Sequence, residues 1–277
     1  MDLTYDEMLE VNKVQLEIFK QFISVCQKLD LKYYMVHGSL LGTIKLNGFF
    51  PFDDDIDVAM PRKDYNTLIK RGQAMMPQNI FIQSYKSEID YPLAFAKIRN
   101  SDTAFIQPTM SRLNINQGIY IDVFPIDYYP ENKFLQKWYM IKERFYGIRI
   151  SERLHYKDEQ PIWKTIMRTA SKIICPSWRK AVERRAELYS GSKKSNLVIS
   201  VGGKTSERGI AKTLFGKGFY HSFEDVSVIC PSKSKEYLIQ IYGEYENYNP
   251  AKKYMNDDNT VTVSAEIIST KESYRNL

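Results

Sequence analysis

The stretch that decides the fold reads Asp53-Asp54-Asp55-Ile56-Asp57-Val58-Ala59-Met60. Four aspartates within five residues repel one another unless a positive charge lies among them. Carboxylate and apolar side chains alternate over residues 55–60 and a proline follows, which predicts a strand. Because successive side chains of a strand point to opposite faces, we expect Asp55 and Asp57 to share one face and the aliphatic residues between them to face the core.

Two carboxylates side by side on a rigid strand are a hard-oxygen site suited to Mg²⁺ or Mn²⁺. Asp53 has the same parity and joins the pair if the strand begins early, whereas Asp54 is expected to point away. One alternative is an acidic loop without a metal. A calcium-binding EF-hand loop is excluded, because the run has no glycine at its sixth position and no glutamate at its twelfth.

A short turn, His37-Gly38-Ser39, lies upstream of the aspartates, where a predicted strand ends and a predicted helix begins. Gly38 lets the backbone approach a ligand closely, and the N–H groups at a helix start bind phosphate oxygens. Ser39 can place its hydroxyl and amide on a phosphate or cap the helix. We expect His37 to be a hydrogen-bonded structural residue rather than a proton shuttle. The turn and the carboxylate strand together resemble the nucleotidyltransferase superfamily.

Several longer stretches narrow the resemblance to one family. They are His37-Gly38-Ser39-Leu40-Leu41-Gly42-Thr43, residues 48–58, Ala96-Lys97-Ile98-Arg99-Asn100, residues 118–127 and Tyr242-Gly243-Glu244-Tyr245. From about residue 30 to residue 250 the chain resembles the LicD family, to which the fukutin-related proteins also belong. The resemblance implies a nucleotidyltransferase fold and the transfer of a phospho-substituent from a cytidine diphosphate donor to a glycan hydroxyl.

The resemblance also implies roles for individual carboxylates. Asp55 and Asp57 become the metal pair, and Asp122 becomes the third carboxylate, as a metal ligand or as the base. Asp122 itself alternates with aliphatic neighbours on a predicted strand. Phosphotransfer of this kind needs a metal on the donor diphosphate and a group that deprotonates the attacking hydroxyl. Asp127 is the alternative third carboxylate, but we expect Pro125 to end the strand before it.

Cationic side chains near this motif have two interpretations each. Lys97 and Arg99 share one face of a predicted strand and either bind donor phosphates or form salt bridges to the aspartates. Arg62 either closes over the carboxylate strand or forms a salt bridge at the start of a helix. Aromatic cages bind quaternary ammonium groups such as choline, but the 20 tyrosines and 14 phenylalanines do not locate one.

Periodicity predicts an α/β fold of the α+β kind, with most strands in residues 1–130 and mostly helices in 131–277. The resemblance implies that residues 1–130 form a mixed-sheet, nucleotidyltransferase-like catalytic core and residues 131–277 a mostly helical, acceptor-side region, unless the two form one continuous domain. Helices are expected over residues 5–29, 39–46, 64–76, 131–157, 161–174, 178–190 and 232–242. Strands are expected over residues 32–36, 55–60, 81–85, 93–99, 103–107, 119–124, 196–201, 226–230 and 260–268. The role of residues 256–277 is left open.

The net charge of +6 is concentrated in one region. Residues 131–194 contain 16 Lys or Arg against 7 Asp or Glu, together with all three tryptophans. Such a basic, aromatic region either contacts an anionic membrane or polyanion, or is an ordinary solvated helical face. The scattered cysteines indicate reduced thiols, and the N-terminus is acidic where a signal peptide would be basic. We therefore expect a cytoplasmic protein that contacts the inner face of the membrane, if at all, through residues 131–194.

The carboxylate strand and the Gly-Ser turn predict a Mg²⁺-dependent phosphotransferase, and the resemblance implies that it acts on a CDP-linked donor such as CDP-choline and releases CMP. The expected acceptor is a hydroxyl of a cell-surface glycan precursor, free or lipid-linked, and the expected substituent is phosphocholine. The first alternative is transfer of glycerol phosphate or ribitol phosphate onto a capsule or teichoic-acid glycan.

Other classes fit the sequence less well. A metal-dependent glycosyltransferase would not need the Gly-Ser turn or the third acidic strand. A nucleic-acid nucleotidyltransferase would spread a basic groove beside its active site, so no nucleic-acid partner is expected. A non-catalytic glycan-binding protein would be expected to lose a metal carboxylate, yet all three are present.

Overall fold

The computed structural model describes residues 1–51, 53–154, 162–202, 209–247, 256 and 260–277. The helices are α1 (Tyr5–Leu29), α2 (His37–Leu46), α3 (Arg62–Thr67), α4 (Lys133–Ser151), α5 (Ile162–Ile174), α6 (Trp178–Ala186), α7 (Lys212–Phe215) and α8 (Ser234–Tyr242). The longer strands are β3 (Asp57–Pro61), β4 (Ile80–Gln83), β5 (Ala96–Asn100), β7 (Ile119–Tyr129), β8 (Leu197–Ser200), β10 (Phe219–Phe223) and β11 (Val226–Cys230). The shorter strands are β1 (Asp2–Leu3), β2 (Tyr34–Met35), β6 (Ala104–Ile106), β9 (Ile210–Ala211), β12 (Val261–Thr262) and β13 (Ile267–Ser269).

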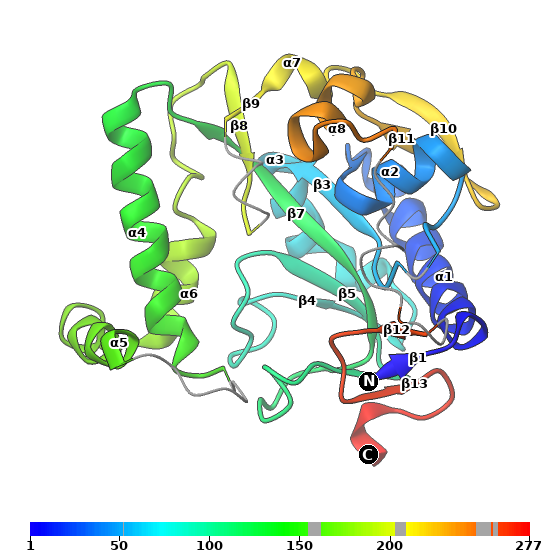
Figure 1. The fold of residues 1–277 in the computed structure, drawn as a ribbon, viewed down its shortest axis with the longest axis horizontal. Coiled ribbons are helices and arrows are strands. Elements are labelled where there is room, and N and C mark those ends of the chain that lie inside the picture. The colour runs from blue at the N-terminus through cyan, green and yellow to red at the C-terminus, as the bar shows by residue number, and fades with distance from the viewer. Residues whose placement is uncertain (52, 155–161, 203–208, 248–255, 257–259) are drawn as a thin grey trace.

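A mixed β-sheet with the strand order β2-β3-β7-β5-β4 forms the centre of the molecule, and β8 also pairs with β7. Figure 1 shows α1 and α2 to one side of this sheet and α4, α5 and α6 as a group on the other. The pair β3 and β7 is parallel, whereas the pairs of β2 with β3 and of β5 with β7 are antiparallel. The predicted α/β class is confirmed.

Helix α1 has the bounds that the apolar spacing predicts. It begins with a capping box, in which the Thr4 hydroxyl accepts from the Glu7 N–H at 3.3 Å and the Glu7 carboxylate accepts from the Thr4 N–H at 2.8 Å. It ends at Asp30, whose φ of 52° lies in the left-handed region. Its buried face also contains two polar residues, Asn12 and Gln15, whose side chains donate to the backbone carbonyls of Asp53 and Asp54.

The register of the three central strands brings polar residues into one row. In the parallel pair Asp57 lies opposite Asp122, and in the antiparallel pair Lys97 lies opposite Asp122. Neighbouring residues such as Val123 and Ile98 point to the other face of the sheet, where α1 packs against β7 and β5. The sheet therefore separates an apolar face toward α1 from a face that carries the aspartates.

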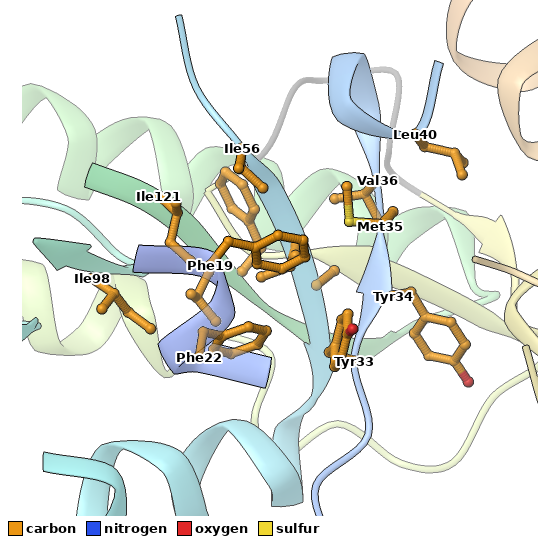
Figure 2. Close-up of a cluster of buried hydrophobic side chains, with 14 of the residues drawn as sticks. Phe19, Phe22, Tyr33, Tyr34, Met35, Val36, Leu40, Ile56, Ile98 and Ile121 are labelled. Atoms are coloured by element: carbon orange, nitrogen blue, oxygen red, sulfur yellow. The ribbon is translucent and has the colours of Figure 1, made fainter. Parts of the chain in front are cut away.

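The apolar face holds the main hydrophobic core. Figure 2 shows Phe19 and Phe22 of α1 together with Ile56, Ile98 and Ile121 from the sheet and the segment that leads into it. All five side chains are buried. Burying side chains of this size contributes about 1.5–3 kcal/mol each. This packing fixes the position of the strands beneath the aspartates.

Strand β7 is longer than predicted, because Pro125 does not end it. Pro125 lies opposite Met60 in the ladder with β3, and its carbonyl accepts from the Val201 N–H at 2.9 Å. The β5 ladder extends along β7 only to Val123, so the missing N–H of Pro125 falls where β5 has ended and β8 begins. The expectation that Asp127 lies beyond the strand is therefore wrong.

The segment predicted as one helix over residues 64–76 is broken. It consists of α3, a π-helical turn over Leu68–Gly72 and a 3₁₀ turn over Gln73–Met75. A Cβ atom added at Gly72 would lie 2.8 Å from Cδ1 of Ile82, so the glycine allows this segment to approach β4 closely. The end of the helix predicted over residues 131–157 and the start of the helix predicted over 161–174 fall on residues 155–161, which lie outside the described residues. Phe52, within the motif of residues 48–58, also lies outside them.

The chain beyond residue 130 completes the central structure. Strand β8 extends the main sheet by pairing with β7, β13 pairs with β6, and β12 pairs with β1. Val228 of β11 and Leu238 of α8 belong to the same core as α1. The helices α4, α5 and α6 make up most of the described part of the basic region. Among the described residues, no helix combines the length and the apolarity needed to cross a bilayer.

Candidate functional site

Three carboxylates converge at the start of β3. Asp55, Asp57 and Asp122 each offer an oxygen that lies within 4.8 Å of the oxygens of the other two. Asp57 and Asp122 are neighbours in the parallel ladder, whereas Asp55 precedes the strand. The Asp122 N–H donates to the Ile56 carbonyl at 2.8 Å, which holds the segment with Asp55 against β7. The structure therefore brings together the three residues that the sequence nominates as metal ligands.

A second acidic group adjoins the first. Asp53, Asp54 and Asp55 also offer oxygens within 4.8 Å of one another, and all three side chains are partly exposed. Strand alternation predicted that Asp54 points away from the metal pair, but its carboxylate lies beside those of Asp53 and Asp55. The reason is that β3 begins only at Asp57, so the alternating geometry of a strand does not apply to residues 53–55.

Two amide side chains of α1 hold the acidic segment from the opposite face. Asn12 Nδ2 donates to the Asp53 carbonyl at 2.9 Å, and Gln15 Nε2 donates to the Asp54 carbonyl at 2.7 Å. Asn12 Nδ2 also lies 3.1 Å from Gln15 Oε1, and both residues are buried. We call this pair the amide clamp. Sequence reasoning missed it, although two amides three residues apart within an apolar helix face are a signal, because buried amides need partners.

The first turn of α2 anchors Asp57 at two points. The Ser39 hydroxyl accepts from the Asp57 N–H at 2.8 Å, and His37 Nδ1 lies 3.2 Å from Asp57 Oδ2. The His37 ring also packs edge-on against Phe124, with ring centroids 5.1 Å apart. Because α2 begins at His37 with Val36 as its N-cap, Ser39 does not cap the helix as one interpretation expected. Its hydroxyl positions a metal-ligand candidate, as does the imidazole.

Gly38 lies directly beside Asp53. A Cβ atom added at Gly38 would lie 3.3 Å from Asp53 Oδ2, which is tighter than most Cβ contacts, and 3.5 Å from Oδ1, which is an ordinary contact. The glycine therefore lets a carboxylate approach the first turn of α2, where the helix dipole favours negative charge. Asp53 therefore lies beside the first turn of α2, the turn that the sequence predicts as a phosphate-binding site.

Lys97 is the cation within the site. Its Nζ donates to Asp122 Oδ1 at 2.6 Å and lies 3.3 Å from the centroid of the Tyr120 ring. The side chain is almost fully buried. This contact is the salt bridge to the aspartates that was one of the two interpretations of Lys97, and it orients Asp122.

Arg99 has contacts of a different kind. Its Nε donates to Gln83 Oε1 and its Nη1 donates to the Gly118 carbonyl, both at 2.5 Å, and the residue is 1% exposed. A Cβ atom added at Gly118 would lie only 1.9 Å from the Asn100 carbonyl oxygen, so the glycine is needed where β7 begins. These contacts hold the start of β7 in place, and they involve neither the aspartates nor any other carboxylate, whereas the sequence offered donor phosphates or the aspartates as partners of Arg99.

Asp127 is paired with Arg62 and lies outside the carboxylate cluster. Arg62 Nε donates to Asp127 Oδ1 at 2.8 Å and Nη2 donates to Oδ2 at 2.5 Å. The same Nη2 donates to the Ala186 carbonyl of α6 at 3.0 Å. Both oxygens of Asp127 are thus used to join β7 to the start of α3 and to α6. The salt-bridge interpretation of Arg62 is the one that the structure shows.

The electrostatics of the cluster show excess negative charge. Burial, followed by the charges of Asp57 and Asp54, raises the pKa of Asp55 well above its usual range. Burial raises the pKa of Asp122 to about 6, although Lys97 acts in the opposite direction. Burial lowers the pKa of Lys97. One lysine does not neutralise the group, and carboxylate oxygens at this spacing fit a hard divalent cation such as Mg²⁺ or Mn²⁺.

We expect Mg²⁺ to stabilise the folded protein. If a cation binds only the native state and its free concentration is about 100 times its Kd, it adds about 2.7 kcal/mol to the free energy of unfolding. Thermal unfolding followed with and without MgCl₂ measures this as a rise in Tm. The double variant Asp55→Asn with Asp57→Asn is expected to lose the rise, and an equal rise in that variant would contradict the assignment of these ligands.

Comparison with known proteins gives two kinds of match. Residues 30–157 match the model of the LicD/FKTN/FKRP nucleotidyltransferase domain. The chain is 24% identical over 247 residues to the lipopolysaccharide cholinephosphotransferase LicD of Haemophilus influenzae, covering 87% of this chain and 92% of the relative. It is also 25% identical over 133 residues to an uncharacterised protein of Rickettsia prowazekii, covering 47% of this chain and 46% of that protein.

Proposed function

We propose that this chain, which carries a LicD-family nucleotidyltransferase domain and is a phosphotransferase, transfers phosphocholine from a CDP-linked donor to a glycan hydroxyl and releases CMP. The observation that carries the proposal is the convergence of Asp55, Asp57 and Asp122 within ligand distance of one another. The similarity to a lipopolysaccharide cholinephosphotransferase supports phosphocholine as the substituent. The acceptor in this proposal is a cell-surface glycan or its lipid-linked precursor, modified on the cytoplasmic side.

The proposed roles follow from the contacts. Asp55 and Asp57 would hold Mg²⁺ or Mn²⁺, which would supply charge neutralisation at the donor diphosphate and at the leaving phosphate. Asp122 acts as a further ligand or as the base, and Lys97 keeps its carboxylate oriented through the 2.6 Å contact. Ser39 positions Asp57 through the hydrogen bond from the Asp57 N–H.

The reaction balances as a single displacement at the distal phosphorus of the donor. The acceptor oxygen forms a bond to this phosphorus, and the bond between the phosphorus and the bridging oxygen breaks. The electron pair of the broken bond leaves with CMP. The proton of the acceptor hydroxyl passes to a carboxylate of the site, for which Asp122 is the candidate because it lies beside the ligand pair on a rigid strand.

A panel of donors tests the proposal. CMP release is measured with CDP-choline, CDP-ethanolamine, CDP-glycerol and CDP-ribitol, each with a glycan acceptor that lacks the substituent. We expect CDP-choline to react fastest, EDTA to reduce release to the rate without protein, and excess MgCl₂ to restore it. Preference for CDP-glycerol or CDP-ribitol would support transfer onto a capsule or teichoic-acid glycan instead. Absence of Mg²⁺-dependent release from every donor, and of CDP-choline binding in calorimetry, would favour a glycan-binding protein.

A further inference from the structure

Helix α5 presents a continuous apolar face to solvent. Five of its large apolar side chains, Ile162, Trp163, Ile166, Ile173 and Ile174, are 57% to 81% exposed. Their spacing places them along one side of the helix, because residues three, four and seven positions apart share a face. Single exposed apolar residues are ordinary on soluble proteins, but a contiguous stripe marks a site of interaction.

The orientation of α5 is the reverse of that of a normal surface helix. Its polar side packs inward: Arg168 Nε donates to the Ser151 hydroxyl at 3.2 Å, and Lys172 Nζ lies 2.5 Å from Glu152 Oε1. Ser171 is buried on the same side. A helix that only completed the fold would turn its apolar stripe toward the protein. The exposed stripe is therefore not explained by folding.

The first half of the neighbouring α4 has a similar exposed surface. Phe134, Leu135, Trp138 and Ile141 are each 43% to 77% exposed. Figure 1 shows α5 at the outer end of the group formed by α4 and α6. The apolar surfaces of this group are thus carried by helices that project from the central sheet.

The charge of the region identifies the partner. Helix α5 has no acidic residue, but two of its three basic residues, Arg168 and Lys172, face the protein, so the attracting charge comes from the surrounding region. Residues 131–194 as a whole contain 16 Lys or Arg against 7 Asp or Glu, an excess of nine positive charges. Such a surface repels a second copy of itself and attracts anionic lipid headgroups, while tryptophan side chains favour the boundary between headgroups and acyl chains.

We propose that α5 lies in the surface layer of an anionic membrane, with the face that contains Ile166 and Ile173 inserted below the headgroups. The helix would lie in the plane of the membrane, as amphipathic interfacial helices do. This inference does not rest on the donor specificity proposed above. It adds that the protein works while bound to a lipid surface, where a lipid-linked acceptor would be concentrated.

Vesicle binding of the full chain tests this proposal. We expect sedimentation with vesicles of phosphatidylglycerol and phosphatidylcholine, weakened by added NaCl, and little binding to phosphatidylcholine alone. The variant Ile166→Ser with Ile173→Ser is expected to bind at least about tenfold more weakly, because each change removes inserted apolar surface. The matched control is Ile89→Ser with Ile239→Ser, which alters isoleucines that are 66% and 56% exposed elsewhere on the protein.

Two further measurements separate the possible outcomes. Asp57→Asn is expected to retain vesicle binding, and the α5 double variant is expected to retain CMP release from a soluble donor, so that failure of one proposal is distinguishable from failure of the other. Equal binding by the α5 variant and the control variant would overturn the membrane assignment. So would a dimer in analytical ultracentrifugation that the α5 changes dissociate while the wild-type protein ignores anionic vesicles.

Discussion

Replacing Asp57 by Asn is expected to abolish Mg²⁺-dependent CMP release while leaving the fold intact. Asn keeps the size of Asp57 and leaves its backbone N–H bonded to Ser39, so the start of β3 is preserved. What is lost is one of the three carboxylates proposed to share the cation, and we expect a fall in kcat on the order of a hundredfold or more. The measurement is CMP release at saturating Mg²⁺, with circular dichroism and Tm recorded on the same protein.

The matched control is Asp102→Asn, which changes an exposed aspartate in the turn between β5 and β6. This variant is expected to keep wild-type activity, because Asp102 does not belong to the carboxylate cluster. If the Asp57 variant retained activity within a few-fold of the wild type, the metal assignment would have to be abandoned.

Asp127→Asn is expected to destabilise the protein by about 3 kcal/mol without removing the chemistry. The change leaves the guanidinium of Arg62 in a mostly buried position without a counter-charge, although one hydrogen bond to the amide oxygen survives. Chemical denaturation measures the free energy of unfolding. CMP release, measured below the unfolding transition, is expected to stay within a few-fold of the wild type.

The comparison variant is Asp122→Asn, five positions earlier on the same strand. It is expected to lose CMP release and the rise in Tm on adding Mg²⁺, and also to lose stability because the buried Lys97 is left without its counter-charge. Both variants replace Asp by Asn, so any difference between their activities or stabilities comes from the position of the residue. Loss of activity in Asp127→Asn but not in Asp122→Asn would show that the third carboxylate has been assigned to the wrong residue.

Features that depend on local spacing could be predicted from the sequence. The apolar repeat located α1 with the correct bounds, and the alternation after Asp55 located β3 to within two residues. The turn at Gly38 and Ser39 was correctly placed beside the aspartates, because a short helix is enough to bring the two motifs together.

Features that depend on distant pairing could not be predicted. The partition of Asp122 and Asp127 into a metal cluster and a salt bridge rests on the register of β7 with β3, and on Arg62, which lies far from both in sequence. The single strand predicted over residues 260–268 is two short strands, β12 and β13, because they pair with different partners, β1 and β6. Local propensity contains no information about such ladders.

The amide clamp means that a fragment of this protein keeps the site intact only if it includes helix α1. The segment that matches the LicD-family domain begins at residue 30. It therefore omits Asn12 and Gln15, whose side chains bind the carbonyls of Asp53 and Asp54. A fragment trimmed to the matched segment would expose the apolar face of the sheet and leave two of the clustered aspartates without their backbone supports. Anyone expressing this enzyme for assay should begin the protein at or before Thr4, so that the first helix is complete and capped.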